Sequence, residues 1–383
     1  MTIYDDLKAF KNYKKHTGTY GIEVETEAPN QYDIPAFKYW KYTDEEHSLR
    51  GFGIEYMLKA PLLWPGEVDK GLKEFELQTA HCNFEKESGS TSVHVHMNML
   101  DESWLTLANI FTTYSLFENL LIRFSGPSRR SNLFCMPICD AEEQYKDIIN
   151  LLRYIKAGKF GNLWNFEEKT NKYSALNFVP LTIHGSIEFR SFRGDPSSVA
   201  IKAWIDILNH ILLFARQVKS PAEIIDLYRH DKTMLGKVVF GDNLFKELYM
   251  EALKQGDNPE QLISKNFWYA ASIALWNKDW TSFGVIEKAP LKVDKAFDKF
   301  CMETFGRPHD LLTDEEKDIV SIIYENNGGN LKAILQPPQG GVAGNVEWAN
   351  AVLQAQPKAN FVPFGDPEPP FEDFELHDFD GDE

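Results

Sequence analysis

Cysteine is scarce in this chain, and its few cysteines do not have the spacing of a metal finger. The 383 residues include 4 cysteines, and Cys135 and Cys139 have no second close pair that would complete a zinc site. Such sparse use of cysteine is typical of a reducing compartment. We therefore expect a cytoplasmic protein.

Long apolar runs and an excess of positive charge are also missing. No run of about eighteen apolar residues occurs, and residues 1–20 lack the apolar segment of a signal peptide. The formal net charge of −17 argues against a general affinity for nucleic acid or for anionic membranes. The sequence therefore predicts a soluble protein that does not span a membrane.

What the chain does contain is a set of short stretches in which charged and apolar residues alternate. They are residues 22–27, 93–98 and 187–190, and residues 53–58 predict a further strand with Glu55 on its polar side. Successive side chains of a strand point to opposite faces, so each stretch has one polar and one apolar face. The polar members are Glu23, Glu25, Glu27, Glu55, His94, His96, Asn98, Glu188 and Arg190.

These polar residues are of the types that bind divalent cations and phosphates. Glu23, Glu25, Glu55 and Glu188, with one or both of His94 and His96, could hold one or two Mg²⁺ ions. Arg190 could neutralise a phosphate, because its planar guanidinium matches phosphate oxygens. Metal carboxylates together with an arginine favour phosphoryl transfer.

Other interpretations of the same residues remain open. A Glu-x-Glu strand is often a solvated face, and an Arg two residues from a Glu is often a surface ion pair. His94 and His96 could also belong to a zinc hydrolase, although barrel-type hydrolases place this motif on an early strand. A cupin-like site would need a later histidine such as His184 or His210. The joint occurrence of three strands in the correct phase favours a site for metal and phosphate.

Around these strands the pattern predicts helices, a second subdomain and a tail. Asp101 and Asp195 are expected to cap long apolar helices that end near residues 124 and 218. We predict an α+β catalytic domain over residues 1–235, a helical subdomain over 236–335, and a Pro/Gly-rich linker with an acidic tail over 336–383. The tail, which we expect to be disordered, either binds a protein partner or serves solubility.

Several of these stretches together resemble a known family. In chain order, and over about residues 18 to 218, they are similar to motifs of the putative amidoligase family. The residues that carry the resemblance are Tyr20–Glu25, Ser48-Leu49 with Gly53–Glu55, Val93–His96, Arg130–Pro137, Tyr173–Asn177 and Ser186–Arg190.

The resemblance implies a fold and a reaction. Members are carboxylate–amine ligases with a fold similar to glutamine synthetase and glutamate-cysteine ligase, in which a curved, mainly antiparallel sheet has helices on its outer face. The resemblance further implies that ATP and Mg²⁺ bind the concave face, and that a carboxylate becomes an acyl phosphate before an amine displaces the phosphate. Ligases of this kind hold nucleotide through metals and arginines, so the missing lysine in the glycine cluster Gly340–Gly344 does not exclude ATP.

Residue roles follow from the same resemblance. Arg190 is implied as a catalytic phosphate contact, together with Glu188 and Glu25 at the catalytic centre, and Arg129 and Arg130 are candidates for a second phosphate contact. The implied metal ligands or their supports are Glu23, Glu25, Glu55, His94, His96 and Glu188.

Two loops depart from the family pattern. The chain has Glu46-His47-Ser48 where relatives show Asp-Gly-Ser, and Gly194-Asp195 where they often show Gly-Thr. Both loops are expected at the substrate end of the site, so the carboxylate and amine substrates, whether small molecules or peptides, stay open. The resemblance also implies a bacterial or phage setting and assembly into a homo-oligomer. The alternative is an inactive binding protein on the same fold, with the tail as its interaction segment.

Overall fold

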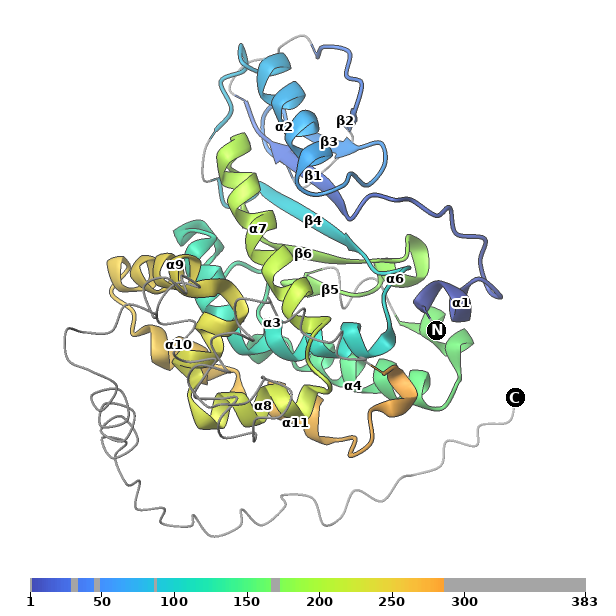
Figure 1. Ribbon diagram of the computed structural model, residues 1–383. Helices are drawn as coiled ribbons and strands as arrows, with labels where there is room; N and C mark the ends of the chain where they lie inside the picture. The colour runs from blue at the N-terminus through green and yellow to red at the C-terminus, as the bar shows by residue number, and fades with distance from the viewer. Residues whose placement is uncertain (1, 29–33, 45–48, 86–87, 167–172, 286–383) are drawn as a thin grey trace, which may run out of the picture. The chain divides into compact units, whose positions relative to one another are not determined.

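The α+β class is confirmed in a computed structural model of the chain, which describes residues 2–28, 34–44, 49–85, 88–166 and 173–285 (Figure 1). The described part forms one compact unit with an open, six-stranded antiparallel sheet. The strands are β1 (Tyr20–Thr26), β2 (Trp40–Thr43), β3 (Ile54–Leu58), β4 (Ser92–Asn98), β5 (Leu176–Asn177) and β6 (Ser186–Arg193).

Helices and short 3₁₀ turns fill the connections. The α-helices are α1 (Ile3–Leu7), α2 (Gly66–Gln78), α3 (Trp104–Phe124), α4 (Glu142–Lys156), α6 (Pro180–Ile183), α7 (Ser198–Ala215), α8 (Pro221–His230), α9 (Lys232–Lys254), α10 (Pro259–Lys265) and α11 (Phe267–Leu275). The 3₁₀ turns are η1 (Pro127–Arg129), η2 (Ile138–Asp140), η3 (Phe160–Asn165) and η4 (Thr281–Phe283). The predicted helices and acidic tail beyond residue 285 lie outside the described residues.

The order of the strands in the sheet is β2-β3-β1-β4-β6-β5. The three strands that the sequence singled out, β1, β4 and β6, are therefore neighbours at the centre. Their register sets Glu23 opposite His94 and His96 opposite Glu188, while Glu25 faces Glu55 of β3. The predicted alternation is confirmed for all four strands.

One face of the sheet is apolar and is covered by helices α2, α3 and α7, which Figure 1 shows against the strands. Aromatic rings join the layers: the ring centroids of Tyr114 on α3 and Phe189 on β6 are 5.1 Å apart. Phe192 on β6 and Trp204 on α7 stack at 5.4 Å. All four side chains bury large apolar surface, which is the main favourable contribution to folding.

Helix α7 has the length and composition of a membrane span, but half of that stretch is buried inside the molecule. Its inner side includes Trp204 and Leu208, both fully buried. A core helix packed on a sheet passes the same test of length and hydropathy, and the buried half of α7 belongs to the core.

The expected caps of α3 and α7 were wrong by two positions. Ser103 caps α3 by accepting a hydrogen bond from the Thr106 amide, and Ser197 caps α7. The two aspartates are engaged elsewhere, because Asp101 pairs with a lysine and Asp195 accepts from the Ser197 amide at 3.1 Å. Serine and aspartate are about equally favourable as N-caps, so residue type alone could not predict which of the two caps each helix.

The helices after α7 pack around α3 and not as a layer on the sheet. Helix α9 crosses the boundary expected at residues 235 and 236, with a break at Gly241, where φ is 74°. Phe117 on α3 meets Phe240 on α9 edge to face at 5.1 Å. The division of the chain into separate domains stays a prediction.

A buried carboxyl lies at the junction of α3 with the later helices. Glu118 is 1% exposed, and it accepts hydrogen bonds from the Ile138 amide at 2.7 Å and from the Asn266 side chain at 3.0 Å. Asn266 lies between α10 and α11. Burial raises the pKa of Glu118 from 4.5 to about 8, although both hydrogen bonds oppose the rise.

This buried carboxyl predicts a pH dependence of stability. Between pH 4.5 and about 8 the folded chain keeps a proton on Glu118 that the unfolded chain has lost, so stability falls as the pH rises through this window. The loss is at most about 5 kcal/mol and levels off above pH 8. We expect Glu118→Gln to flatten this part of the profile, as measured by urea unfolding at several pH values. The exposed Glu143→Gln is the control, and an equal slope in wild type and Glu118→Gln would contradict the prediction.

Candidate functional site

The polar face of the sheet gathers seven of the predicted site residues into one cluster. Each comes from the outward side of a central strand, and the cross-strand register brings neighbours of different strands together. The cluster consists of Glu23 and Glu25 on β1, Glu55 on β3, His94 and His96 on β4, and Glu188 and Arg190 on β6.

His94 lies at the centre of this cluster and is almost fully buried. Its Nδ1 atom is 3.2 Å from Glu23 Oε2 and 3.3 Å from Glu188 Oε1. Its Nε2 atom is 2.7 Å from the Ser92 hydroxyl, which itself donates to Glu25. Because that hydroxyl has one proton to give, it accepts from Nε2–H of His94. A proton on Nδ1 then donates to Glu23, and a metal ion that replaced this proton would be bound by the Nδ1 lone pair.

His96 offers a second nitrogen to the same carboxylates. Its Nε2 is 3.3 Å from Glu23 Oε1 and 3.9 Å from Glu188 Oε1. This atom is buried, and its contact with Glu23 is an ion pair. Its other ring nitrogen is 3.2 Å from the Ser186 hydroxyl, which orients the ring. A buried imidazole nitrogen beside two carboxylates brings together donor atoms of the types that ligate divalent cations.

Glu188 links the imidazoles to the guanidinium of Arg190. Arg190 donates through Nη1 to Glu188 Oε1, and the same Nη1 is 3.5 Å from His94 Nδ1. The second oxygen of Glu188 accepts from Asn177 on β5 at 2.8 Å. Asn177 is in turn fixed by the Val179 amide, so the carboxylate is held from both sides.

The ionisation of the cluster follows from these contacts. Burial would raise the pKa of Glu23, but hydrogen bonds from His94 and His96 and their charge hold it well below its usual range. Burial also opposes ionisation of Glu188, and the charge of Arg190 and of both histidines still lowers its pKa. For His96, burial disfavours the charged ring, yet the hydrogen bond and charge of Glu23 raise its pKa. Glu23 and Glu188 are therefore ionised and available as ligands.

Two overlapping sets of donor atoms could each hold a metal ion. One set is Glu23, Glu55 and His94, the other is Glu23, His96 and Glu188, and within each set the donor atoms lie within 4.8 Å of one another. Glu23 is common to both. Carboxylate oxygens are what Mg²⁺ and Mn²⁺ prefer, and imidazole is a further ligand acceptable to many divalent metals.

Two predicted phosphate contacts are not brought into this cluster. Arg129 is 1% exposed and donates to the backbone carbonyls of Thr91 at 3.2 Å and Arg190 at 2.9 Å. Arg130 pairs with Asp257, which also accepts from Arg123. Both guanidinium groups are thus engaged elsewhere, and Arg190 is the arginine that lies among the carboxylates.

Glu27 and Asn98, the outer members of their polar rows, serve loops near the sheet. Glu27 follows the end of β1 and accepts from Ser88, from Ser90 and from the Arg50 amide. Asn98 ties the strand β4 to the carbonyl of Gly18. The loops that carry Glu46–Ser48 lie outside the described residues, so the departure from the family pattern there stays untested.

Sequence reasoning missed three polar residues that position the cluster: Ser92, Asn177 and Ser186. Each is a small hydrogen-bonding residue at or near a strand end, and such residues are common there for many reasons. Two signals were present: Ser92 precedes His94 by two positions and so shares its face of the strand, and Asn177 and Ser186 belong to stretches that carry the family resemblance.

The position of Arg129 predicts a structural and not a phosphate-binding effect of its removal. We expect Arg129→Met to lower the free energy of unfolding by about 3 kcal/mol, because the carbonyl groups of Thr91, just before β4, and of Arg190 on β6 lose a charged donor. Arg130 is partly exposed, so Arg130→Gln should lower the free energy of unfolding by less than about 1 kcal/mol. Urea unfolding measures both changes, and equal small effects would contradict the assignment of Arg129.

Comparison with known proteins bears on the central part of the chain. Residues 76–212 match a protein family described as "Putative amidoligase enzyme". The match runs from the end of α2 to α7 and includes His94, His96, Glu188 and Arg190, while Glu23, Glu25 and Glu55 precede it. No curated protein and no solved structure matched the chain. Recognition of the putative amidoligase family from the sequence motifs is therefore confirmed over residues 76–212.

Proposed function

We propose that this chain is an ATP- and Mg²⁺-dependent carboxylate–amine ligase that forms an amide or peptide bond through an acyl phosphate. The observation that carries the proposal is the meeting of four carboxylates, two imidazoles and one guanidinium on the polar face of the sheet. The family match supports ligase chemistry for the segment that supplies both histidines and the arginine. An antiparallel sheet with the long helices α2, α3 and α7 on its apolar face also supports the glutamine synthetase-like fold that the resemblance implied.

In this proposal the carboxylates hold the metal and leave Arg190 for phosphate. Bound Mg²⁺ would supply positive charge that neutralises the phosphate oxygens during transfer. Glu23, shared by both donor sets, would hold two ions together, with Glu55 and His94 on one side and His96 and Glu188 on the other. Arg190 keeps its Nε free of hydrogen bonds to the described residues, so its guanidinium can turn an edge toward a phosphate.

The proposed reaction has two balanced steps. A substrate carboxylate oxygen forms a bond to the γ-phosphorus of ATP as the bond to the β-phosphate oxygen breaks, which releases ADP. An amine then forms the C–N bond, phosphate leaves with the C–O bonding pair, and the amine proton passes to a base. We assign that base to Glu25, which is held by the Ser92 hydroxyl beside His94.

The shared ligand Glu23 gives the proposal a direct test by metal binding. Mn²⁺, which can be followed by electron paramagnetic resonance, should bind wild type, and Glu23→Gln should weaken binding at least about tenfold because both donor sets lose a ligand. Glu247→Gln, an exposed carboxylate on α9, should bind like wild type. If Glu23→Gln bound Mn²⁺ as wild type does, the metal would lie elsewhere. Zinc that stays stoichiometric through purification would instead favour a hydrolase.

Nucleotide binding tests the ligase itself. We expect calorimetry to detect ATP binding to wild type with Mg²⁺ and not without it, and to detect none with the double variant Glu23→Gln/Glu25→Gln. Circular dichroism of the variant checks that it is folded. The opposite result, no ATP binding by wild type under either condition, would contradict the ligase function and favour a binding protein on the same fold.

A cytoplasmic location, a protein partner for the acidic tail and a homo-oligomer stay predictions.

A further inference from the structure

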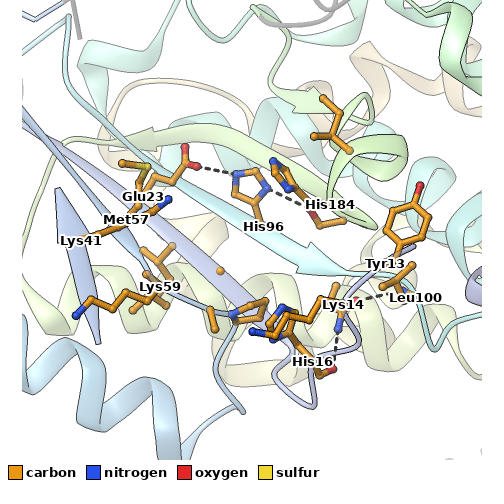
Figure 2. Close-up of a pocket in the computed structure, with 18 of the residues that line it drawn as sticks. Tyr13, Lys14, His16, Glu23, Lys41, Met57, Lys59, His96, Leu100 and His184 are labelled. Carbon is orange, nitrogen blue, oxygen red and sulfur yellow. Dashed lines mark hydrogen bonds and ion pairs between the residues drawn. The ribbon is translucent and has the colours of Figure 1, made fainter. Parts of the chain in front are cut away.

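A cavity of about 420 Å³ opens next to the cluster and shares two of its residues (Figure 2). Glu23 and His96 form one side of this cavity, which is large enough for a small substrate. Its floor includes Gly21, where an added Cβ would lie 3.3 Å from the Cβ of His96. The absence of a side chain at Gly21 therefore keeps the space beside His96 open.

The lining of this cavity is strongly basic. Four lysines line it: Lys11 and Lys14 from the segment between α1 and β1, Lys41 from β2, and Lys59 after β3. Glu23 is the one acidic residue among the described residues that line it. Figure 2 shows Lys14 and Lys41 on different sides of the space in front of His96.

These lysines are not neutralised by carboxylates of the described chain. Lys11 donates to the carbonyl of Ile183 at 2.7 Å, and Lys59 donates to the carbonyl of Phe37 at 2.6 Å. By contrast, two lysines of the same N-terminal segment lie outside the cavity and are paired, Lys8 with Asp5 at 3.0 Å and Lys15 with Asp101 at 3.1 Å.

The positive charge of the lining helps to lower the pKa of two of its histidines, His184 and His16. Burial lowers the pKa of His184, and the charge of His96, Lys11 and Lys41 lowers it further. Burial and the charge of Lys14 likewise lower the pKa of His16. Both rings thus stay neutral near pH 7, and the cations of the lining are the lysines together with His96 beside Glu23.

Hydrogen bonds hold the segment between α1 and β1, which carries Lys11 and Lys14, against the rest of the fold. The Asn98 side chain donates to the carbonyls of His16 at 3.3 Å and Gly18 at 3.0 Å. The buried Tyr13 hydroxyl donates to the carbonyl of Thr182 at 2.8 Å. The segment carrying Lys11 and Lys14 is therefore positioned before any ligand enters.

We propose that this cavity binds the acid substrate, and that the substrate is an oligo-acid such as an acidic peptide. The inference rests on the proposed ligase function and names its substrate class. One carboxylate would lie at Glu23 and His96, where the metals bind, and further negative charges would meet Lys11, Lys14 and Lys41. A single carboxylate would not use so many unpaired cations.

The test uses the full chain with Mg²⁺ and without ATP, and two tripeptides as probes. Tri-L-glutamate carries a carboxylate on each side chain and at its C-terminus, whereas tri-L-alanine has the C-terminal one alone. We expect calorimetry to show tri-glutamate binding at least about tenfold tighter than trialanine. Lys14→Gln/Lys41→Gln should lose at least about that factor, and the matched control Lys8→Gln/Lys15→Gln should bind as wild type.

A charge-neutral variant gives a second measurement. Gly21→Val fills the floor of the cavity without removing a lysine and should weaken tri-glutamate binding to a similar degree. Circular dichroism checks the fold of each variant. Equal binding of the two tripeptides, or tri-glutamate binding that neither variant changes, would overturn the proposal. Inorganic triphosphate that binds more tightly than tri-glutamate, with the same loss in the lysine variant, would make the cavity a phosphate site and also overturn it.

The two proposals can fail separately. Tri-glutamate binding is measured without nucleotide, and Mg²⁺-dependent ATP binding is measured on the same proteins without peptide. Normal ATP binding without any tri-glutamate binding would contradict the proposed substrate class but not the proposed ligase function. Tri-glutamate binding to a chain that binds no ATP would sink the ligase.

Discussion

Burial of one face of the sheet is the constraint on which the candidate site depends. Ile22, Val24, Val95, Ile187 and Phe189 are each at most 1% exposed beneath the covering helices. Burying such side chains stabilises a fold by about 1.5–3 kcal/mol each, and a slip of one residue would turn a whole row toward water. The apolar rows therefore fix the register, and the register forces the charged rows together on the opposite face.

Like charges held together in this way need partners of the opposite sign. Glu23 and Glu188 meet both histidines, and Glu188 also meets Arg190. Ser92 and Asn177 add hydrogen bonds that orient an imidazole and a carboxylate. The cluster is thus ordered by its own contacts, which lowers the cost of arranging ligands when a cation binds.

The sequence predicted the parts of the site that depend on alternation and failed where distant segments meet. Period-two patterning is local, so the face shared by Glu23, His94 and Glu188 could be read from three separate stretches. The fate of Arg129 could not, because its partners are backbone carbonyls some 38 and 61 positions away in the chain. The lysine cavity was missed for the same reason, since its walls come from the N-terminal segment and from β2 and β3.

The net charge of −17 gave no indication that the cavity beside Glu23 is lined by lysines. Lys41 lies opposite Met57, Met57 lies opposite Glu23, and Glu23 lies opposite His94, so a cation and the candidate metal ligands share one row across the sheet. Two strand spacings separate β2 from β1, which is about 10 Å. An extended peptide covers that distance with about three residues. A substrate with one carboxylate at the metals and another at Lys41 would therefore have the length of a short acidic peptide, which is longer than a single amino acid.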